Sequence, residues 1–274
     1  MLTQLLPQFL KKPMKQAYTS AIDYGELLLG FRDVLTPPRS RIFIGAGDYK
    51  VVGQEFKRHF INIGGLKPQE SVLDVGCGIG RMAVPLTNYL TAPGRYEGFD
   101  IVGHGIDWCL HNITPRFDNF NFQVADIYNS HYNPSGNYQA YNYRFPFDDN
   151  SFDFVFLTSV FTHMPVQEVD HYLSEISRVL KPGGRCFSTF FLLNDQSRRL
   201  MKTENSTYNF QYKLDGRYVF SLEDPDLGTA FDQFTIQTML GRYGLSAQNF
   251  IYPGSWCGRR NTATFQDIVV AYKR

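Results

Sequence analysis

The chain has 274 residues, with 27 Lys and Arg against 26 Asp and Glu, and 43% of its residues are apolar. A chain of this length can bury a sizeable core in one large domain or two small ones, and this composition excludes a disordered tail. A net charge of +1 without a basic stripe argues against a protein that binds a nucleic-acid backbone. Aromatic residues reach 16%, so their rings must fill a core or an apolar pocket.

The four cysteines, at positions 77, 109, 186 and 257, lie far apart, with no C-x-x-C and no nearby histidine pair. We therefore expect reduced thiols in a cytoplasmic protein, and we identify no set of metal ligands. The first residues, MLTQLLPQFLKKPMK, place apolar residues before the lysines, which is the reverse of a signal peptide. No run approaches the ~18 consecutive apolar residues of a transmembrane helix, so we expect no membrane span.

Predicted elements follow one another in two regimes. Residues 1–67 lack a strand pattern and contain a helix-compatible stretch at 49–63, which predicts a helical N-terminal cap. From residue 68 onwards, strands are predicted at 71–75, 95–99, 120–124, 152–158 and 185–193, with helices at 81–90, 106–115 and 166–180. A helix at about 231–243 and a hairpin of 247–252 with 262–272 follow. This alternation predicts an α/β fold with a mostly parallel, doubly wound sheet and an antiparallel end.

Two inserts interrupt the alternation within the predicted domain of residues 68–274. The first, 128–143, is rich in tyrosine, and the second, 194–228, is polar without a sustained period. Long irregular connections in a compact fold are often lids or binding loops. We expect the second insert and the N-terminal cap to cover a substrate.

The most informative run is VLDVGCGIGR, in which a strand leads into a glycine turn and then a helix. In this geometry, backbone N–H groups of the turn can approach a ligand closely. The glycines follow G-x-G-x-G, and Arg81 occupies the place of the third glycine in the dinucleotide pattern G-x-G-x-x-G. This spacing argues against a pyrophosphate cofactor.

Acidic residues end the next two predicted strands. Asp100 follows Asp74 by 26 residues, where an α/β nucleotide site places a carboxylate on the ribose hydroxyls. Asp126 ends the third strand, where it could meet the exocyclic amine of an adenine. A cofactor with an amine, a diol and an adenine but no phosphate would suit these acids. Each acid could instead cap a helix, and for Asp126 alone the two interpretations weigh equally.

The motifs resemble those of the class I S-adenosylmethionine-dependent methyltransferases, in order and in register from about residue 70 to the end. VLDVGCGIG is similar to the first motif of that family and YEGFDI to its acidic second motif, while FPFDDNSFD and RVLKPGG resemble two later segments. The resemblance implies a seven-stranded sheet with an antiparallel last strand. It also implies S-adenosylmethionine as the methyl donor, with S-adenosylhomocysteine as the product.

Site residues follow from the resemblance, position by position. Asp74 and the loop with Gly76, Cys77, Gly78 and Gly80 would hold the methionine end of the cofactor. Asp100 would bind the ribose and Ile101 would pack on the adenine. Asp126 and Ile127 would bound the amine edge of the adenine, and Thr158 and Ser159 would lie beside the sulfonium.

The segment after the fourth strand reads TSVFTHM and lacks N-P-P-Y, D-P-P-Y and a Pro-Cys nucleophile, which further disfavours nucleic-acid methylation. His163 is the best candidate base, because imidazole titrates near neutral pH. Its ring could instead cap a helix or bond a backbone carbonyl. The tyrosines of 128–143 fit an acceptor pocket and a covered sheet edge equally well, and the turn at 255–260 could reach the acceptor with an arginine.

These observations predict a methyltransferase acting on oxygen, nitrogen or carbon of a small or medium organic acceptor. Two alternatives remain open. One is a methyltransferase for a protein or lipid-linked substrate, and the other is a non-catalytic binding module with the same fold.

Overall fold

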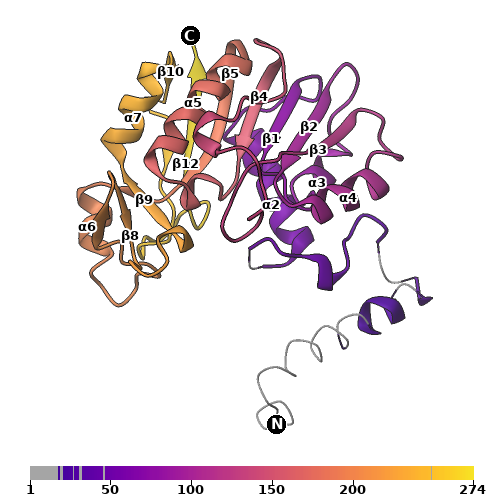
Figure 1. The fold of residues 1–274 in the computed structure, drawn as a ribbon, viewed down its shortest axis with the longest axis horizontal. Coiled ribbons are helices and arrows are strands. Elements are labelled where there is room, and N and C mark those ends of the chain that lie inside the picture. The colour runs from indigo at the N-terminus through magenta and orange to yellow at the C-terminus, as the bar shows by residue number, and fades with distance from the viewer. Residues whose placement is uncertain (1–17, 19–20, 27, 31–32, 46, 248) are drawn as a thin grey trace.

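The computed structural model describes the chain apart from residues 1–17, 19–20, 27, 31–32, 46 and 248. Its centre is a sheet in the order β10-β12-β5-β4-β1-β2-β3, with β11 paired to β12 (Figure 1). Strands β1 to β5 are parallel to one another, and β12 is antiparallel to β5 and β10. The predicted mostly parallel sheet with an antiparallel last strand is therefore confirmed. The strands of this sheet are β1 (Ser71–Val75), β2 (Arg95–Asp100), β3 (Phe120–Val124), β4 (Phe152–Leu157), β5 (Leu180–Phe190), β10 (Leu245–Ser246), β11 (Ile251–Tyr252) and β12 (Asp267–Lys273).

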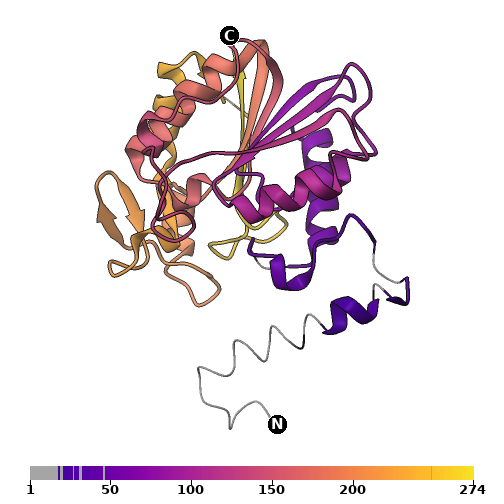
Figure 2. The ribbon, with the colours of Figure 1, turned by 45° about the vertical axis from the view of Figure 1, so that its right-hand side comes forward.

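Helices cover both faces of this sheet (Figure 2). On one face pack α2 (Tyr49–Asn62), α3 (Ala83–Leu86) and α4 (Gly103–Asn112), and on the other pack α5 (Val166–Val179) and α7 (Gln233–Arg242). Along β4, Phe154 and Phe156 pack on the face covered by α2, α3 and α4, while Val155 and Leu157 pack on the face covered by α5 and α7. Burial on both faces explains why this strand is almost wholly apolar.

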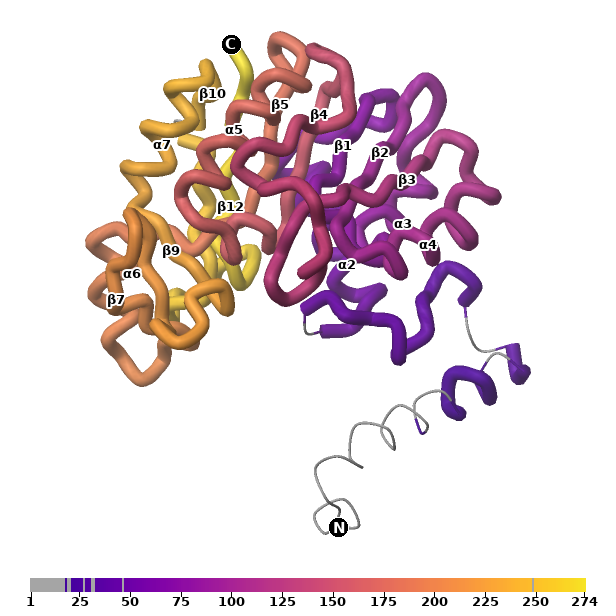
Figure 3. The backbone as a smooth tube through the Cα atoms, in the orientation of Figure 1, coloured from indigo at the N-terminus to yellow at the C-terminus, as the bar shows by residue number. Residues whose placement is uncertain are grey.

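A second, smaller sheet forms where the sequence predicted an irregular insert, and that part of the prediction is wrong. Its order is β6-β9-β8-β7, and it lies to one side of the main sheet (Figure 3). Residues 194–228 supply α6 and the β7–β8 hairpin, and their apolar side chains, Phe210 among them, pack on Phe191 and Trp256. Short strands joined by polar turns have no sustained period, so the pattern could not reveal them. The elements are β6 (Leu192–Leu193), α6 (Asp195–Leu200), β7 (Tyr212–Leu214), β8 (Arg217–Val219) and β9 (Thr229–Asp232).

Several predicted boundaries move. The helix predicted at 81–90 shrinks to α3. Pro85 has no N–H and cannot donate to the Arg81 carbonyl, as a helix that begins at 81 would require. The strand predicted to end at 193 changes sheet, since Leu192 leaves β5 and pairs with Phe231 of β9. That pairing also removes residues 231–232 from the predicted helix. Four 3₁₀ turns complete the labelled elements, namely η1 (Arg39–Arg41), η2 (Ala140–Asn142), η3 (Phe161–His163) and η4 (Pro225–Leu227).

The N-terminal region contains a short helical stretch at residues 21–26, followed by η1 and α2. Arg39 links the first two, because its guanidinium lies 2.9 Å from the Asp23 carboxylate and 2.7 Å from that of Glu26. The first 17 residues, on which the signal-peptide argument rests, lie outside the described part of the chain. None of the described helices combines the length and apolar character needed to cross a bilayer.

Candidate cofactor and acceptor site

The glycine turn after β1 is shaped by positive φ angles that favour glycine. Gly76, Gly78 and Gly80 have φ angles of 81°, 59° and 76°. A Cβ added to Gly76 would lie 2.5 Å from Val160 Cγ2, and one added to Gly78 would lie 2.7 Å from Ile44 Cγ2. The backbone of the turn is therefore closely packed between the segment after β4 and a segment of the N-terminal region.

Asp100, at the end of β2, binds directly to this turn. Its Oδ2 accepts a hydrogen bond from the Gly78 N–H at 2.7 Å, and its Oδ1 accepts one from the Val102 N–H at 2.8 Å. Burial raises the pKa of Asp100, and the backbone donors lower it in part. Each oxygen keeps a second lone pair, so the carboxylate can still accept hydrogen bonds from a ligand.

Asp74 lies deeper, in β1, and is 1% exposed. Its Oδ2 accepts a hydrogen bond from the Tyr96 hydroxyl at 2.6 Å, and its Oδ1 is buried without a partner among the described residues. Burial raises the pKa of Asp74 well above its usual range, and repulsion from Asp100 adds to the effect. Cys77 is also buried here, and burial raises the pKa of its thiol, so the side chain packs rather than reacts.

Asp126 holds the tyrosine-rich insert in place. The Asn137 backbone N–H donates to its Oδ1 at 3.1 Å, and the Asn137 side-chain amide donates to its Oδ2 at 2.6 Å. Ile127 is buried and bridges to Tyr138, whereas Ile101 is only partly buried. Asp126 thus caps a loop rather than a helix, a structural role that the helix-cap alternative did not anticipate.

The N-terminal region contacts the glycine turn, and no sequence pattern predicted which of its residues would do so. The ring of Phe43 lies 4.9 Å from that of His104 in α4 and 6.4 Å from that of Tyr132 in the insert. Beside it, Arg81 donates to the Gly45 carbonyl at 3.1 Å, and the Tyr49 hydroxyl donates to the Ile79 carbonyl at 2.9 Å. The predicted cap therefore contacts the same turn as Asp100.

The β4 end presents Thr158 and Ser159. Ser159 has a φ of 60°, a strained conformation for a residue other than glycine. Its N–H donates to Thr189 Oγ1 at 2.8 Å, and its hydroxyl donates to Gln266 Oε1 at 3.0 Å. These bonds fix the strained residue at the carboxyl edge of the sheet.

His163, in η3, is exposed, and its Nδ1 lies 2.8 Å from the Asp226 carbonyl oxygen. A carbonyl only accepts hydrogen bonds, so Nδ1 carries a hydrogen and Nε2 of the neutral ring keeps its lone pair. The ring of His163 thus bonds a backbone carbonyl, as the alternative interpretation expected, and this bond leaves Nε2 able to take a proton. Within the described residues, no three His, Cys, Asp or Glu side chains cluster as metal ligands.

Comparisons with known proteins identify the kind of domain. Residues 73–188 match the model of a methyltransferase domain. The chain is 29% identical over 154 residues to sterol 24-C-methyltransferase of Schizosaccharomyces pombe, a match that covers 54% of this chain and 35% of that protein. The matches thus span only part of the curated relatives' length.

Solved structures share the fold. The PH0226 protein of Pyrococcus horikoshii superposes with a TM-score of 0.57 at 16% identity, covering 86% of this chain and 95% of that one. Magnesium protoporphyrin IX methyltransferase of Synechocystis, solved with bound S-adenosylhomocysteine, gives a TM-score of 0.50 at 16% identity, covering 96% and 100% of the two chains. Residues 73–188 therefore form a methyltransferase domain of the S-adenosylmethionine-dependent class, whose cofactor is S-adenosylmethionine.

Proposed function

We propose that the glycine turn and the ends of β1 to β4 bind S-adenosylmethionine. The observation that carries this proposal is the 2.7 Å bond between Asp100 and the Gly78 N–H, which joins the acid of β2 to the turn of β1. The remaining lone pairs of the Asp100 carboxylate would accept hydrogen bonds from the ribose hydroxyls. The buried, unpartnered Oδ1 of Asp74 would accept a hydrogen bond from the cofactor's ammonium group, directly or through water.

The other cofactor residues have supporting roles in this proposal. The turn from Gly76 to Gly80, with Cys77 packed beneath it, supplies closely approaching backbone. Ile101 packs on the adenine, and Asp126 and Ile127 bound its amine edge. Asn137 already uses both Asp126 oxygens, so the adenine amine would share this carboxylate with the insert.

The proposed reaction is methylation of oxygen, nitrogen or carbon in a small or medium organic acceptor. The bound cofactor supplies a methyl group on a sulfonium, and transfer is an in-line displacement that depends mainly on positioning. Thr158 and Ser159 would border the reacting groups at the β4 end. His163 would remove the acceptor's proton at Nε2, because its Nδ1 hydrogen is held by the Asp226 carbonyl.

Calorimetry with S-adenosylhomocysteine tests the cofactor site. We expect the wild-type chain to bind, and the Asp100→Ala variant to bind more weakly by a few kcal/mol, through loss of a charge-assisted hydrogen bond. Asp107→Ala, which changes an exposed acid of the adjacent α4, is the matched control. Asp100→Asn, which keeps one acceptor oxygen, separates lost ligand contacts from misfolding if the alanine variant is unstable.

Two outcomes would contradict the proposal. One is the absence of binding heat with the wild-type chain. The other is equal affinity of a folded Asp100 variant and the wild-type chain.

A further inference from the structure

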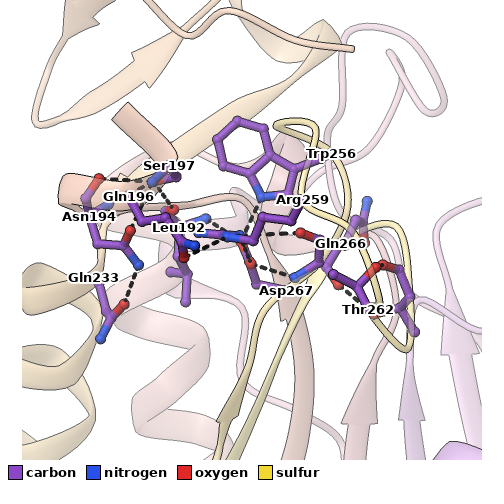
Figure 4. A network of polar contacts seen from close by, with 12 residues as sticks. Leu192, Asn194, Gln196, Ser197, Gln233, Trp256, Arg259, Thr262, Gln266 and Asp267 are labelled. Carbon is purple, nitrogen blue, oxygen red and sulfur yellow. Dashed lines mark hydrogen bonds and ion pairs between the residues drawn. The ribbon is translucent and has the colours of Figure 1, made fainter. Parts of the chain in front are cut away.

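A buried ion pair lies at the carboxyl edge of the main sheet, beside the β4 end. Arg259, in the loop before β12, lies 2.9 Å from Asp267, the first residue of β12 (Figure 4). Their side chains are only 5% and 2% exposed. A buried charged pair of this kind requires every hydrogen-bonding group to be accounted for.

The carboxylate of Asp267 has no lone pair left to accept a further hydrogen bond. Its Oδ1 accepts from the Gly254 N–H at 2.7 Å and from Arg259 Nη1, and its Oδ2 accepts from the Leu192 N–H at 2.8 Å and the Trp256 indole N–H at 2.7 Å. A carboxylate offers about four lone-pair sites, so Asp267 is saturated. The aspartate cannot serve a further donor of Arg259.

The guanidinium of Arg259 keeps one nitrogen without a hydrogen-bond acceptor among the described residues. Its Nε donates to Gln196 Oε1 at 3.2 Å, and its Nη1 donates to Asp267 and to the Gly254 carbonyl at 3.2 Å. Its Nη2 is buried and has no hydrogen-bond partner among the described residues. Because a guanidinium only donates, this nitrogen needs an acceptor that the described part of the chain does not provide.

The ion pair lies next in sequence to a residue that contacts the β4 end. Gln266, the neighbour of Asp267, accepts a hydrogen bond from the Ser159 hydroxyl at 3.0 Å, and Ser159 is the residue expected beside the transferred methyl group. Asp267 itself pairs with Phe190 at the end of β5, the strand next to β4. Gln196, which accepts the hydrogen bond of Arg259 Nε, is exposed, so one side of the guanidinium lies near the surface.

We propose that Arg259 Nη2 binds an anionic oxygen, a carboxylate or a phosphate, of the methyl acceptor. Saturation of Asp267 favours an anion over an ammonium group, since the network offers an unused donor and no unused carboxylate. Charge-assisted bonds from arginine to such oxygens are among the strongest hydrogen bonds in proteins. This inference rests on the proposed function, because it places the ligand in the acceptor region.

The test measures binding of inorganic phosphate and of acetate, by calorimetry, to protein saturated with S-adenosylhomocysteine. We expect the wild-type chain to bind at least one of the two anions, and the Arg259→Lys variant to bind it about tenfold to a hundredfold more weakly. Lysine keeps the charge beside Asp267 but lacks the second nitrogen. Arg260→Gln, at the adjacent exposed arginine, is the matched control and should bind as the wild-type chain does.

Preference for acetate would indicate a carboxylate acceptor, and preference for phosphate would indicate a phosphorylated one. Absence of anion binding by the wild-type chain, or equal binding by a folded Arg259→Lys variant, would overturn the proposal. Binding of S-adenosylhomocysteine is measured first on the same samples, so a failure of the cofactor site is distinguished from a failure of the anion site. Thermal unfolding of each variant identifies any loss of fold. Arg259→Gln provides a second test if the Arg259→Lys variant is unstable.

Discussion

Glu168 in the first turn of α5 provides a test of pH-dependent stability. Burial raises the pKa of this carboxyl from 4.5 to about 7, and repulsion from Asp226 adds to the shift, while Arg217 opposes it. The folded state therefore holds the Glu168 proton more tightly than the unfolded state does. Stability from this group is fully present below about pH 4.5 and is lost as pH rises through about 7.

The size of the effect follows from the shift. At about 1.4 kcal/mol per pKa unit, a change from 4.5 to about 7 corresponds to about 3 kcal/mol on full ionisation. Glu168 is partly exposed, so solvent screening reduces this to about 1–2 kcal/mol. Glu168→Gln, a neutral isostere, should therefore leave stability at pH 5 nearly unchanged and increase it at pH 8 by that amount.

The assay is urea unfolding at pH 5 and pH 8, with thermal unfolding expected to show a gain of about 2–6 °C at pH 8. Glu204→Gln changes an exposed glutamate and controls for the loss of one negative charge. If Glu168→Gln and wild type differ equally at both pH values, ionisation of Glu168 does not destabilise the fold. A less stable variant at pH 8 would show that attraction to Arg217 outweighs burial.

Three further predictions address the site itself. Gly76→Ala should lower the free energy of unfolding in urea by about 2–4 kcal/mol, because its Cβ would clash with Val160 at a positive φ. Gly183→Ala is the control for backbone strain alone, since Gly183 has a φ of 77° and no atom within 4 Å of an added Cβ. Equal losses in the two variants would show that Val160 plays no part. Binding of S-adenosylhomocysteine should release protons, because its ammonium group lowers the raised pKa values of Asp74 and Asp100. Calorimetry in buffers of different ionisation heats, repeated across the acidic pH range, measures this, and zero exchange throughout would contradict it. His163→Ala should lower kcat about 100-fold with unchanged cofactor affinity, and a near-normal kcat would leave its ring only a structural role.

The cofactor half of the molecule was largely predictable from sequence because its residues follow a local pattern. Strands β1 and β3 have the predicted bounds, and Asp100 meets the glycine turn as the strand order requires. Neighbouring parallel strands end at the same edge, so a short repeat of strand and turn fixes which residues meet. The burial of Asp74 beneath Tyr96 was not predictable, since a cross-strand contact of this kind has no sequence signature.

The acceptor half was predictable only in outline, because its contacts join distant segments. The second sheet depends on Leu192 leaving the main sheet for Phe231, a pairing between residues 39 positions apart in sequence. Saturation of Asp267 depends on donors from the loop between β11 and β12 and from Leu192 of β6, and it could not be counted without coordinates. The arginine suggested for the turn at 255–260 was identified from residue type, whereas its unused nitrogen is a tertiary property.

This contrast suggests that cofactor binding and acceptor recognition can be altered separately. Hydrogen bonds connect the β4–α5 segment to the later chain: from Ser159 to Thr189 in β5 and to Gln266 before β12, and between His163 and Asp226 in η4. Arg217 of β8 holds Asp226 through a 3.1 Å ion pair, so the small sheet sets the orientation of the candidate base through Asp226. A change at Arg217 should therefore alter the acceptor KM and the pH profile of kcat while S-adenosylhomocysteine still binds normally. If it weakened cofactor binding as strongly as an Asp100 variant, the two halves would have to be treated as one cooperative site.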